Sequence, residues 1–200
     1  LVRAAEGMHP LVIALWRTIF AAVLFAPMVR KVGRADLLRM AVAGALLAAH
    51  FGTWFASLGL TTVLRSTVLV TLAPVWAGLL EWGLLGQAPR RRFWLGLALA
   101  IPGVALMSGL SSGSGSLAGD ALAVLGGMLG GSYFLVGRVT RRRVGIGTYA
   151  ALTCAFAAVA LLPVAVIAGL PLTGFEWSTW GWVFLLALGP QLLGHNGLNY

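Results

Sequence analysis

Long apolar runs dominate this sequence and restrict the chain to one class of fold. Seven of them follow one another, at residues 10–29, 37–58, 63–85, 93–110, 119–137, 146–169 and 179–200. A bilayer core about 30 Å thick is crossed by about 20 helical residues, which is close to the length of each run. The runs lack the alternating pattern of membrane β-strands. We therefore expect an all-α polytopic membrane protein with about seven spans in this sequence.

The composition excludes a soluble domain, because charged residues are too scarce to cover a soluble surface. Of the 200 residues, 60% are hydrophobic and 10% are charged, whereas soluble domains are about 25% charged. The formal net charge of +9 does not indicate a nucleic-acid partner, because the basic residues form short clusters between apolar runs. Cys154 is the one cysteine, so no internal disulfide and no cysteine-based metal site can form.

Basic residues mark every second connection between the runs. Eleven of the fourteen Lys and Arg residues lie in the loops 30–39, 86–92 and 138–145. The loop 170–178 has neither Lys nor Arg and carries Glu176 instead. By the positive-inside rule, the three basic loops face the cytoplasm. We expect a multi-pass protein of the inner (plasma) membrane, with the lipid bilayer as its surroundings.

The first two runs and the last two share a sequence pattern. Three features recur in the same order: Phe-Ala-Ala-Val at 20–23 and 156–159, a proline at Pro27 and Pro163, and a histidine with glycine two residues later at His50 and His195. The spacing makes five helices one repeat, so the second copy enters the membrane from the opposite side. The opposite charge of loops 30–39 and 170–178 agrees with such an inverted repeat.

Short motifs along the runs match a known family. They are Ala14-Leu15-Trp16-Arg17 with Ala21-Ala22, His50 with Trp54 and Leu58, Leu72-Ala73-Pro74-Val75-Trp76, Gly96 with Gly103-Val104, and Gly194-His195 with Asn199-Tyr200. In their order and spacing they resemble the EamA-type family of the drug/metabolite transporter (DMT) superfamily. The resemblance covers essentially the whole chain. One departure is Gln87, where such proteins often carry a glutamate after the fourth helix.

The resemblance implies a ten-helix protein built from two inverted five-helix repeats. Residues 1–110 would be the first repeat without its first helix, and 111–118 a Ser/Gly linker. Residues 119–200 would be the first three helices of the second repeat. We therefore expect one further helix before this sequence and at least two after it.

Polar residues inside the apolar runs are candidates for function, because lipid makes them costly. His50 lies near the middle of its run, and Trp54 and Ser57 follow on the same helix face. His195 is its repeat equivalent, and transporter substrates tend to bind where repeats meet. We expect a substrate pathway lined by His50, Trp54, Ser57, His195, Asn196 and Asn199, with Arg17 and Pro74 as further members.

Structural explanations for the same residues stay open. Each histidine can simply form a hydrogen bond between helices. Arg17 and Arg65 can extend along their helices to the membrane interface. Pro74 breaks its run about midway and can serve as a hinge or as a packing kink. The glycines within 126–131 are expected to pack a helix closely inside the fold.

These observations favour a secondary transporter that exports small metabolites, such as amino acids or their derivatives, or drugs. The expected mechanism is alternating access between the inverted repeats. The alternatives are an intramembrane enzyme and a membrane interaction protein without transport. We expect no catalytic residue, metal or cofactor, because neither a His-Glu-x-x-His metal motif nor an ATP-binding motif occurs in the sequence. Proton coupling, substrate identity, transport direction and oligomeric state stay open.

The inverted topology can be tested with reporter tags. A tag inserted in 30–39 should report the cytoplasm, and a tag in 170–178 should report the outer side, because only the first loop is basic. Tags that report the same side for both loops would contradict the inverted repeat.

Overall fold

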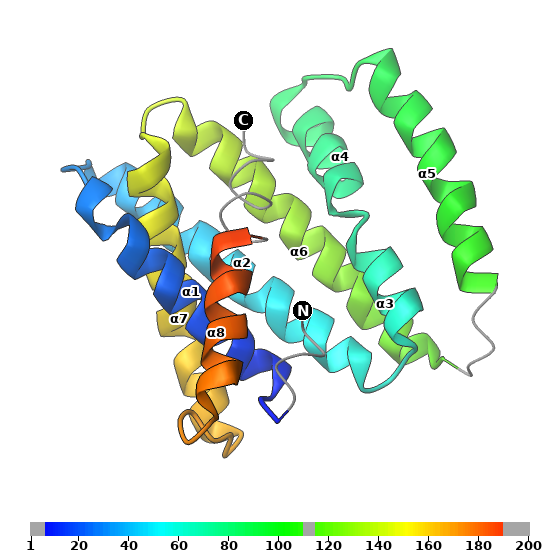
Figure 1. Cartoon of the computed structure of the whole chain (residues 1–200). Helices are drawn as coiled ribbons and strands as arrows, with labels where there is room; N and C mark the ends of the chain where they lie inside the picture. Colours follow the sequence, from blue (N-terminus) through cyan, green and yellow to red (C-terminus); the bar gives the residue numbers. More distant parts are fainter. Residues whose placement is uncertain (1–6, 110–114, 190–200) are drawn as a thin grey trace. The chain divides into compact units, whose positions relative to one another are not determined.

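A computed structural model describes residues 7–109 and 115–189. Contacts divide the chain into two compact units, of which unit 1 comprises 1–48 and 136–200 and unit 2 comprises 49–135. The helices are shown in Figure 1: α1 (Pro10–Phe25), the 3-10 helix η2 (Ala26–Met28), α2 (Arg34–Leu58), α3 (Val63–Val70), α4 (Ala73–Leu85), α5 (Arg91–Gly109), α6 (Leu117–Arg141), α7 (Ile146–Ile167) and α8 (Trp177–Leu186).

The described residues contain helices and no strand, which confirms the predicted all-α class. Five segments are long and apolar enough to cross a membrane: Pro10–Met28, Arg34–Leu58, Val63–Leu85, Leu117–Arg141 and Ile146–Ile167. The other two predicted runs correspond to α5, which starts with Arg91 and Arg92, and to α8, which the structure describes over 10 residues. Each of the seven predicted runs therefore corresponds to helix over most of its described length, the run 63–85 as two helices.

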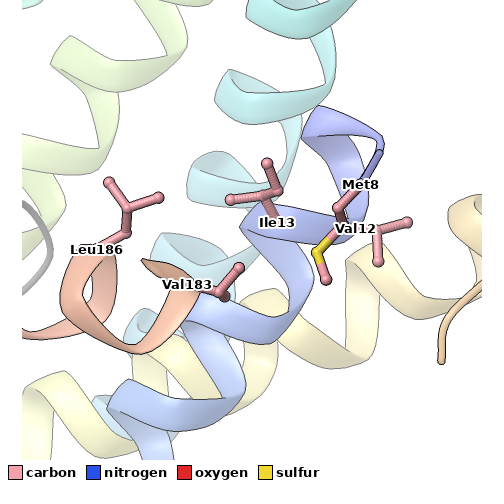
Figure 2. Packing of buried hydrophobic residues seen from close by; sticks show 5 residues of the cluster. All are labelled: Met8, Val12, Ile13, Val183 and Leu186. Atoms are coloured by element: carbon pink, nitrogen blue, oxygen red, sulfur yellow. The ribbon is translucent and has the colours of Figure 1, made fainter. Parts of the chain in front are cut away.

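In unit 1, α1 packs against α7 and α8. Its contact with α8 is a cluster of buried apolar side chains, formed by Met8, Val12, Ile13, Val183 and Leu186 (Figure 2). Two tryptophans extend this contact, because the Trp16 and Trp180 rings meet edge to face with centroids 4.9 Å apart. The indole N–H of Trp16 also donates a hydrogen bond to the carbonyl oxygen of Leu172, 2.9 Å away.

A glycine lets the first half of α2 approach the backbone of α7. A Cβ atom added at Gly44 would lie 2.8 Å from the carbonyl oxygen of Thr153 and 2.9 Å from the amide nitrogen of Ala157. Any larger residue would force these helices apart. Small residues commonly permit such close approach in membrane proteins, where packing takes over from hydrophobic burial.

Hydrogen bonds in unit 1 show which loops lie at the same end of it. The Thr148 hydroxyl donates to the carbonyl oxygen of Met28 at 2.9 Å and accepts from the backbone N–H of Arg30 at 3.0 Å. The start of the basic loop 30–39 therefore lies beside Thr148, which follows the end of the basic loop 138–145. Leu172, in contrast, lies beside Trp16 in the first half of α1.

In unit 2, four glycines of α6 form a face that packs against its neighbours. A Cβ atom at Gly131 would lie 2.7 Å from the backbone of both Ala73 and Ala77 in α4. At Gly127 it would lie 3.1 Å from the carbonyl oxygen of Leu69 in α3. Gly126 and Gly130 contact residues of α2 in the same way. The prediction that these glycines pack inside the fold is confirmed.

The predicted run at 63–85 is interrupted near its middle. Helix α3 ends at Val70, and α4 begins at Ala73 with Pro74 in its first turn. Proline lacks the N–H that would have bonded the carbonyl of residue 70, and its ring excludes that carbonyl sterically. Leu72, between the helices, turns back to bond the carbonyl of Leu69 at 3.3 Å. The interruption expected at Pro74 is therefore present.

The close packing of α6 predicts a cost for a single methyl group. Gly131→Ala should lower the free energy of unfolding by about 1–3 kcal/mol, because backbone atoms of α4 must move to admit the Cβ atom. Gly96→Ala in α5 is the matched control, since a Cβ atom there meets nothing within 4 Å. Thermal unfolding in detergent would compare the two. Equal midpoints for both variants would contradict the packing described.

Candidate functional site

The polar residues of α2 in unit 2 form a row on one side of the helix. His50, Trp54 and Ser57 are four and three residues apart, a spacing that places side chains on the same face. The row rises about 10 Å along the helix. Thr61 continues it in the turn that ends α2, where its N–H bonds the carbonyl oxygen of Ser57 at 2.9 Å. We call these four residues the α2 polar row.

His50 lies near the middle of α2 and is bound to α6. Its side chain is 5% exposed, and Nδ1 lies 2.8 Å from the carbonyl oxygen of Gly126. A carbonyl oxygen only accepts hydrogen bonds, so Nδ1 carries the hydrogen and donates. The hydrogen bond between helices, expected as the structural explanation for His50, is thus present.

The position of His50 depends on Gly130 of α6, which has no side chain. A Cβ atom at Gly130 would lie 2.9 Å from Nδ1 of His50. The glycine therefore leaves the space in which the imidazole reaches the backbone of α6. Side-chain bonds to main-chain carbonyls are one way in which membrane helices satisfy polar groups.

Trp54 presents a donor that the fold itself does not use. Its indole Nε1 is buried and has no hydrogen-bond partner in the part of the chain that the structure describes. The ring lies beside His50, with centroids 6.0 Å apart, and stacks on Phe55 at 5.2 Å. Buried polar groups nearly always have partners, so this N–H is the strongest indication of a ligand contact in the α2 polar row.

Ser57 joins α2 to α3. Its buried hydroxyl donates to the carbonyl oxygen of Trp54 at 2.6 Å and lies 2.5 Å from the hydroxyl of Ser66. Since the hydrogen of Ser57 is used within its own helix, the Ser66 hydroxyl donates to Ser57. The structure thus gives Ser57 a role in helix pairing.

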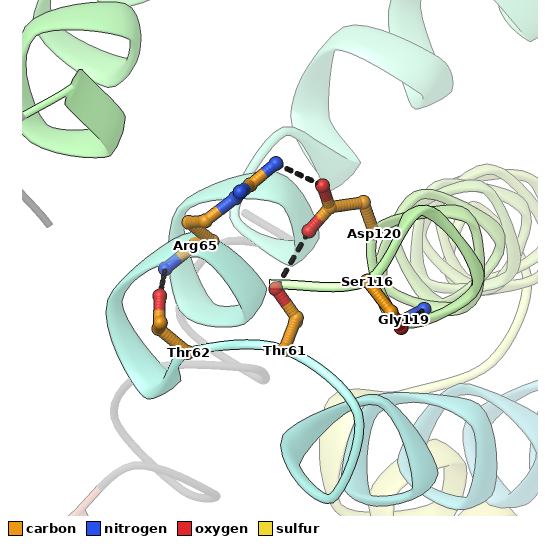
Figure 3. A network of polar contacts seen from close by, with 6 residues as sticks. All are labelled: Thr61, Thr62, Arg65, Ser116, Gly119 and Asp120. Carbon is orange, nitrogen blue, oxygen red and sulfur yellow. Dashed lines mark hydrogen bonds and ion pairs between the residues drawn. The ribbon is translucent and has the colours of Figure 1, made fainter. Parts of the chain in front are cut away.

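A carboxylate that the sequence analysis missed lies beside the end of the α2 polar row. Asp120, in the first turn of α6, accepts a hydrogen bond from the Thr61 hydroxyl at 2.8 Å (Figure 3). Its second carboxylate oxygen pairs with the guanidinium of Arg65 in α3. Arg65, for which extension to the membrane interface was expected, is thus held against α6 by an ion pair near the start of both helices.

Arg17 belongs to unit 1 and is also enclosed. Its side chain is 7% exposed in α1, close enough to the thiol of Cys154 in α7 for an electrostatic interaction. Extension of Arg17 along the surface of its helix, one of the structural explanations, is therefore wrong. Pro74 lies exposed in the first turn of α4.

The remaining predicted site residues, His195, Asn196 and Asn199, lie outside the described residues. Of the eight expected pathway residues, the structure brings His50, Trp54 and Ser57 together on one face of α2. Within 7–109 and 115–189, no group of three or more His, Cys, Asp or Glu residues could hold a metal ion.

Comparisons with known proteins identify the family. The model of the EamA-like transporter family, part of the DMT superfamily, matches residues 2–109. A solved structure described only as "Crystal structure of protein" is similar in fold, with a TM-score of 0.78 and 18% identity over 98% of this chain and 71% of that chain. No match was found among curated proteins. The chain belongs to the EamA-like transporter family.

Proposed function

We propose that the protein is a secondary transporter that exports small metabolites, such as amino acids or their derivatives, or drugs across the inner membrane. Membership of a transporter family supports the general activity. The observation that carries the proposal is the buried indole N–H of Trp54, which finds no acceptor among the described residues. A donor left unused inside a membrane span is what a passing substrate with an acceptor oxygen would bind.

The α2 polar row gives this proposal its chemistry. Trp54 would donate to a carboxylate or carbonyl oxygen of the substrate, while its ring and that of Phe55 contact an apolar part. His50, held through Nδ1 by the carbonyl of Gly126, would add its ring beside that of Trp54 to the wall of the substrate pathway. Uptake of a proton by a pathway histidine would couple transport to the proton gradient.

The other pathway residues stay part of the proposal. Ser57 would act by joining α2 to α3, and Pro74 by interrupting the helix that follows. Arg17 would attract an anionic group of the substrate. His195, Asn196 and Asn199 would contribute the equivalent surface of the second repeat. Alternating access between the two inverted repeats would carry the substrate, with the basic loops 30–39, 86–92 and 138–145 in the cytoplasm.

Export can be measured with the full-length protein in proteoliposomes. Vesicles loaded with each of the radiolabelled common amino acids, or with the dye ethidium, should release at least one of these compounds faster than vesicles without protein. Imposing a proton gradient during the assay tests coupling. Correctly inserted protein that releases none of them would contradict the proposed activity.

The role of Trp54 can be tested by removing its N–H while the ring stays. Trp54→Phe should reduce the export rate about tenfold, since one hydrogen bond from a buried donor contributes about 1–1.5 kcal/mol. Trp177→Phe is the matched control, because that tryptophan is 90% exposed. Equal export by both variants would exclude the indole N–H as a substrate contact.

Both histidines can be examined in the same assay. His50→Ala and His195→Ala should each lower export, because the proposal gives them equivalent places in the two repeats. Unchanged export in both variants would remove the histidines from the pathway and leave the hydrogen bond of His50 to Gly126 as a structural contact.

A further inference from the structure

We propose that Asp120 acts as a latch that holds one end of unit 2 closed during the transport cycle. In this arrangement Arg65 and Thr61 are released when α3 turns about the interruption before Pro74. The inference rests on the proposed transport function, because a latch has meaning only in a protein that opens and closes. By the positive-inside rule this end faces away from the cytoplasm, since α3 starts opposite the basic loop 86–92.

Both oxygens of the Asp120 carboxylate bind the same neighbouring segment. Oδ1 of Asp120 accepts from the hydroxyl of Thr61 at 2.8 Å, and Oδ2 pairs with the guanidinium of Arg65. Both partners lie at the junction of α2 and α3, whereas Asp120 lies in α6. In the predicted division of the chain, the junction belongs to the first repeat and α6 begins the second. The carboxylate thus bridges the two repeats.

The segment on the other side of the latch is a short helix with an interruption at its far end. Helix α3 comprises Val63–Val70 and is separated from α4 by the interruption at 71–72. The Thr62 hydroxyl caps its start by accepting from the N–H of Arg65 at 3.2 Å. Beyond the other end of α3, the backbone of α4 packs tightly on Gly131 of α6. The closest backbone contact with α6 therefore lies at α4, and the start of α3, which Ser66 pairs with Ser57 of α2, is the end that Asp120 holds.

The turn between α2 and α3 lies in close contact with the start of α6. A Cβ atom at Gly119 would lie 2.8 Å from the carbonyl carbon of Leu60 and from the amide nitrogen of Thr61. The N–H of Ser116 also donates to the carbonyl oxygen of Leu60 at 3.1 Å. The turn thus rests directly on the start of α6, and the ion pair closes over a contact that only glycine permits.

The ion pair of Arg65 and Asp120 can open without leaving a fully buried charge. The side chains of Arg65 and Asp120 are 30% and 16% exposed, so water reaches both partners. Partly exposed ion pairs contribute little stability, whereas breaking a fully buried pair strands a charge at high cost. A pair at this depth suits a contact that has to form and break repeatedly.

The latch can be tested by a distance measurement that needs no substrate. Spin labels at Leu60→Cys and Leu117→Cys, both exposed positions beside the latch, report the separation of the α2–α3 turn from α6. The native Cys154 is replaced by alanine, and the full-length protein is studied in lipid nanodiscs by pulsed electron paramagnetic resonance. The otherwise unchanged protein should show mainly a short distance.

Loss of the latch should add a second, longer distance. We expect it in Asp120→Asn, in Arg65→Gln and in Gly119→Ala, which displaces the turn without changing a charge. The exchange of both charges, Arg65→Asp with Asp120→Arg, should restore the short distance. Asp36→Asn is the matched control, because it breaks a different ion pair, Asp36–Arg39, whose exposures of 19% and 38% are similar.

Distance distributions for Asp120→Asn and Arg65→Gln that match Asp36→Asn would overturn the latch, whatever the export assay shows. A cleavable crosslinker between the two cysteines separates a latch from a fixed structural contact. Crosslinking should lower export at least tenfold, and reduction should restore it, because the turn has to leave α6 in each cycle. Full export by the crosslinked protein would overturn the proposal while the transport function stands.

Discussion

The cost of leaving polar groups unpaired in lipid governs this structure. Every backbone N–H and carbonyl in the hydrocarbon core needs a partner within the protein, which restricts the chain to helices. The same cost applies to side chains and explains why the described polar residues come in connected sets. His50 uses the backbone of α6, Ser57 uses α3, and Asp120 takes both Thr61 and Arg65. The buried N–H of Trp54 and the buried hydroxyl of Thr153 in α7 depart from this pattern, because neither has a hydrogen-bond partner among the described residues. Of the two, Trp54 lies in the α2 polar row, which is why we propose it as a substrate contact.

Glycine makes these connections possible. The glycines of α6 leave no side chain that would separate this helix from α2, α3 and α4. Gly44 in α2 lets that helix approach the backbone of α7. The imidazole of His50 can reach the carbonyl of Gly126 because Gly130 has no Cβ atom. Close helix packing and polar pairing in unit 2 therefore depend on the same glycines. The interruption before Pro74 separates α3 from α4 within that packing.

The sequence predicted what depends on local pattern. Apolar run lengths located the helices, the proline located the interruption, and the glycine spacing indicated close packing within the fold. The sequence did not predict contacts between residues distant in the chain. Nothing near Arg65 in sequence indicates that it pairs with Asp120, 55 residues later. The same holds for His50 and Gly126, because a backbone carbonyl has no residue type by which to recognise it. The expected equivalence of His50 and His195 stays a prediction, since the latter lies outside the described residues.

The central claim is that the α2 polar row borders a path that opens beside Asp120. The most direct test is the reactivity of a cysteine at Trp54, in the Cys154→Ala background, toward a water-soluble thiol reagent that does not cross lipid. Added outside sealed proteoliposomes, the reagent should label Trp54→Cys, and labelling should be faster when Asp120→Asn is also present. Absence of labelling in both proteins would mean that no aqueous path reaches this face of α2, and would contradict the account.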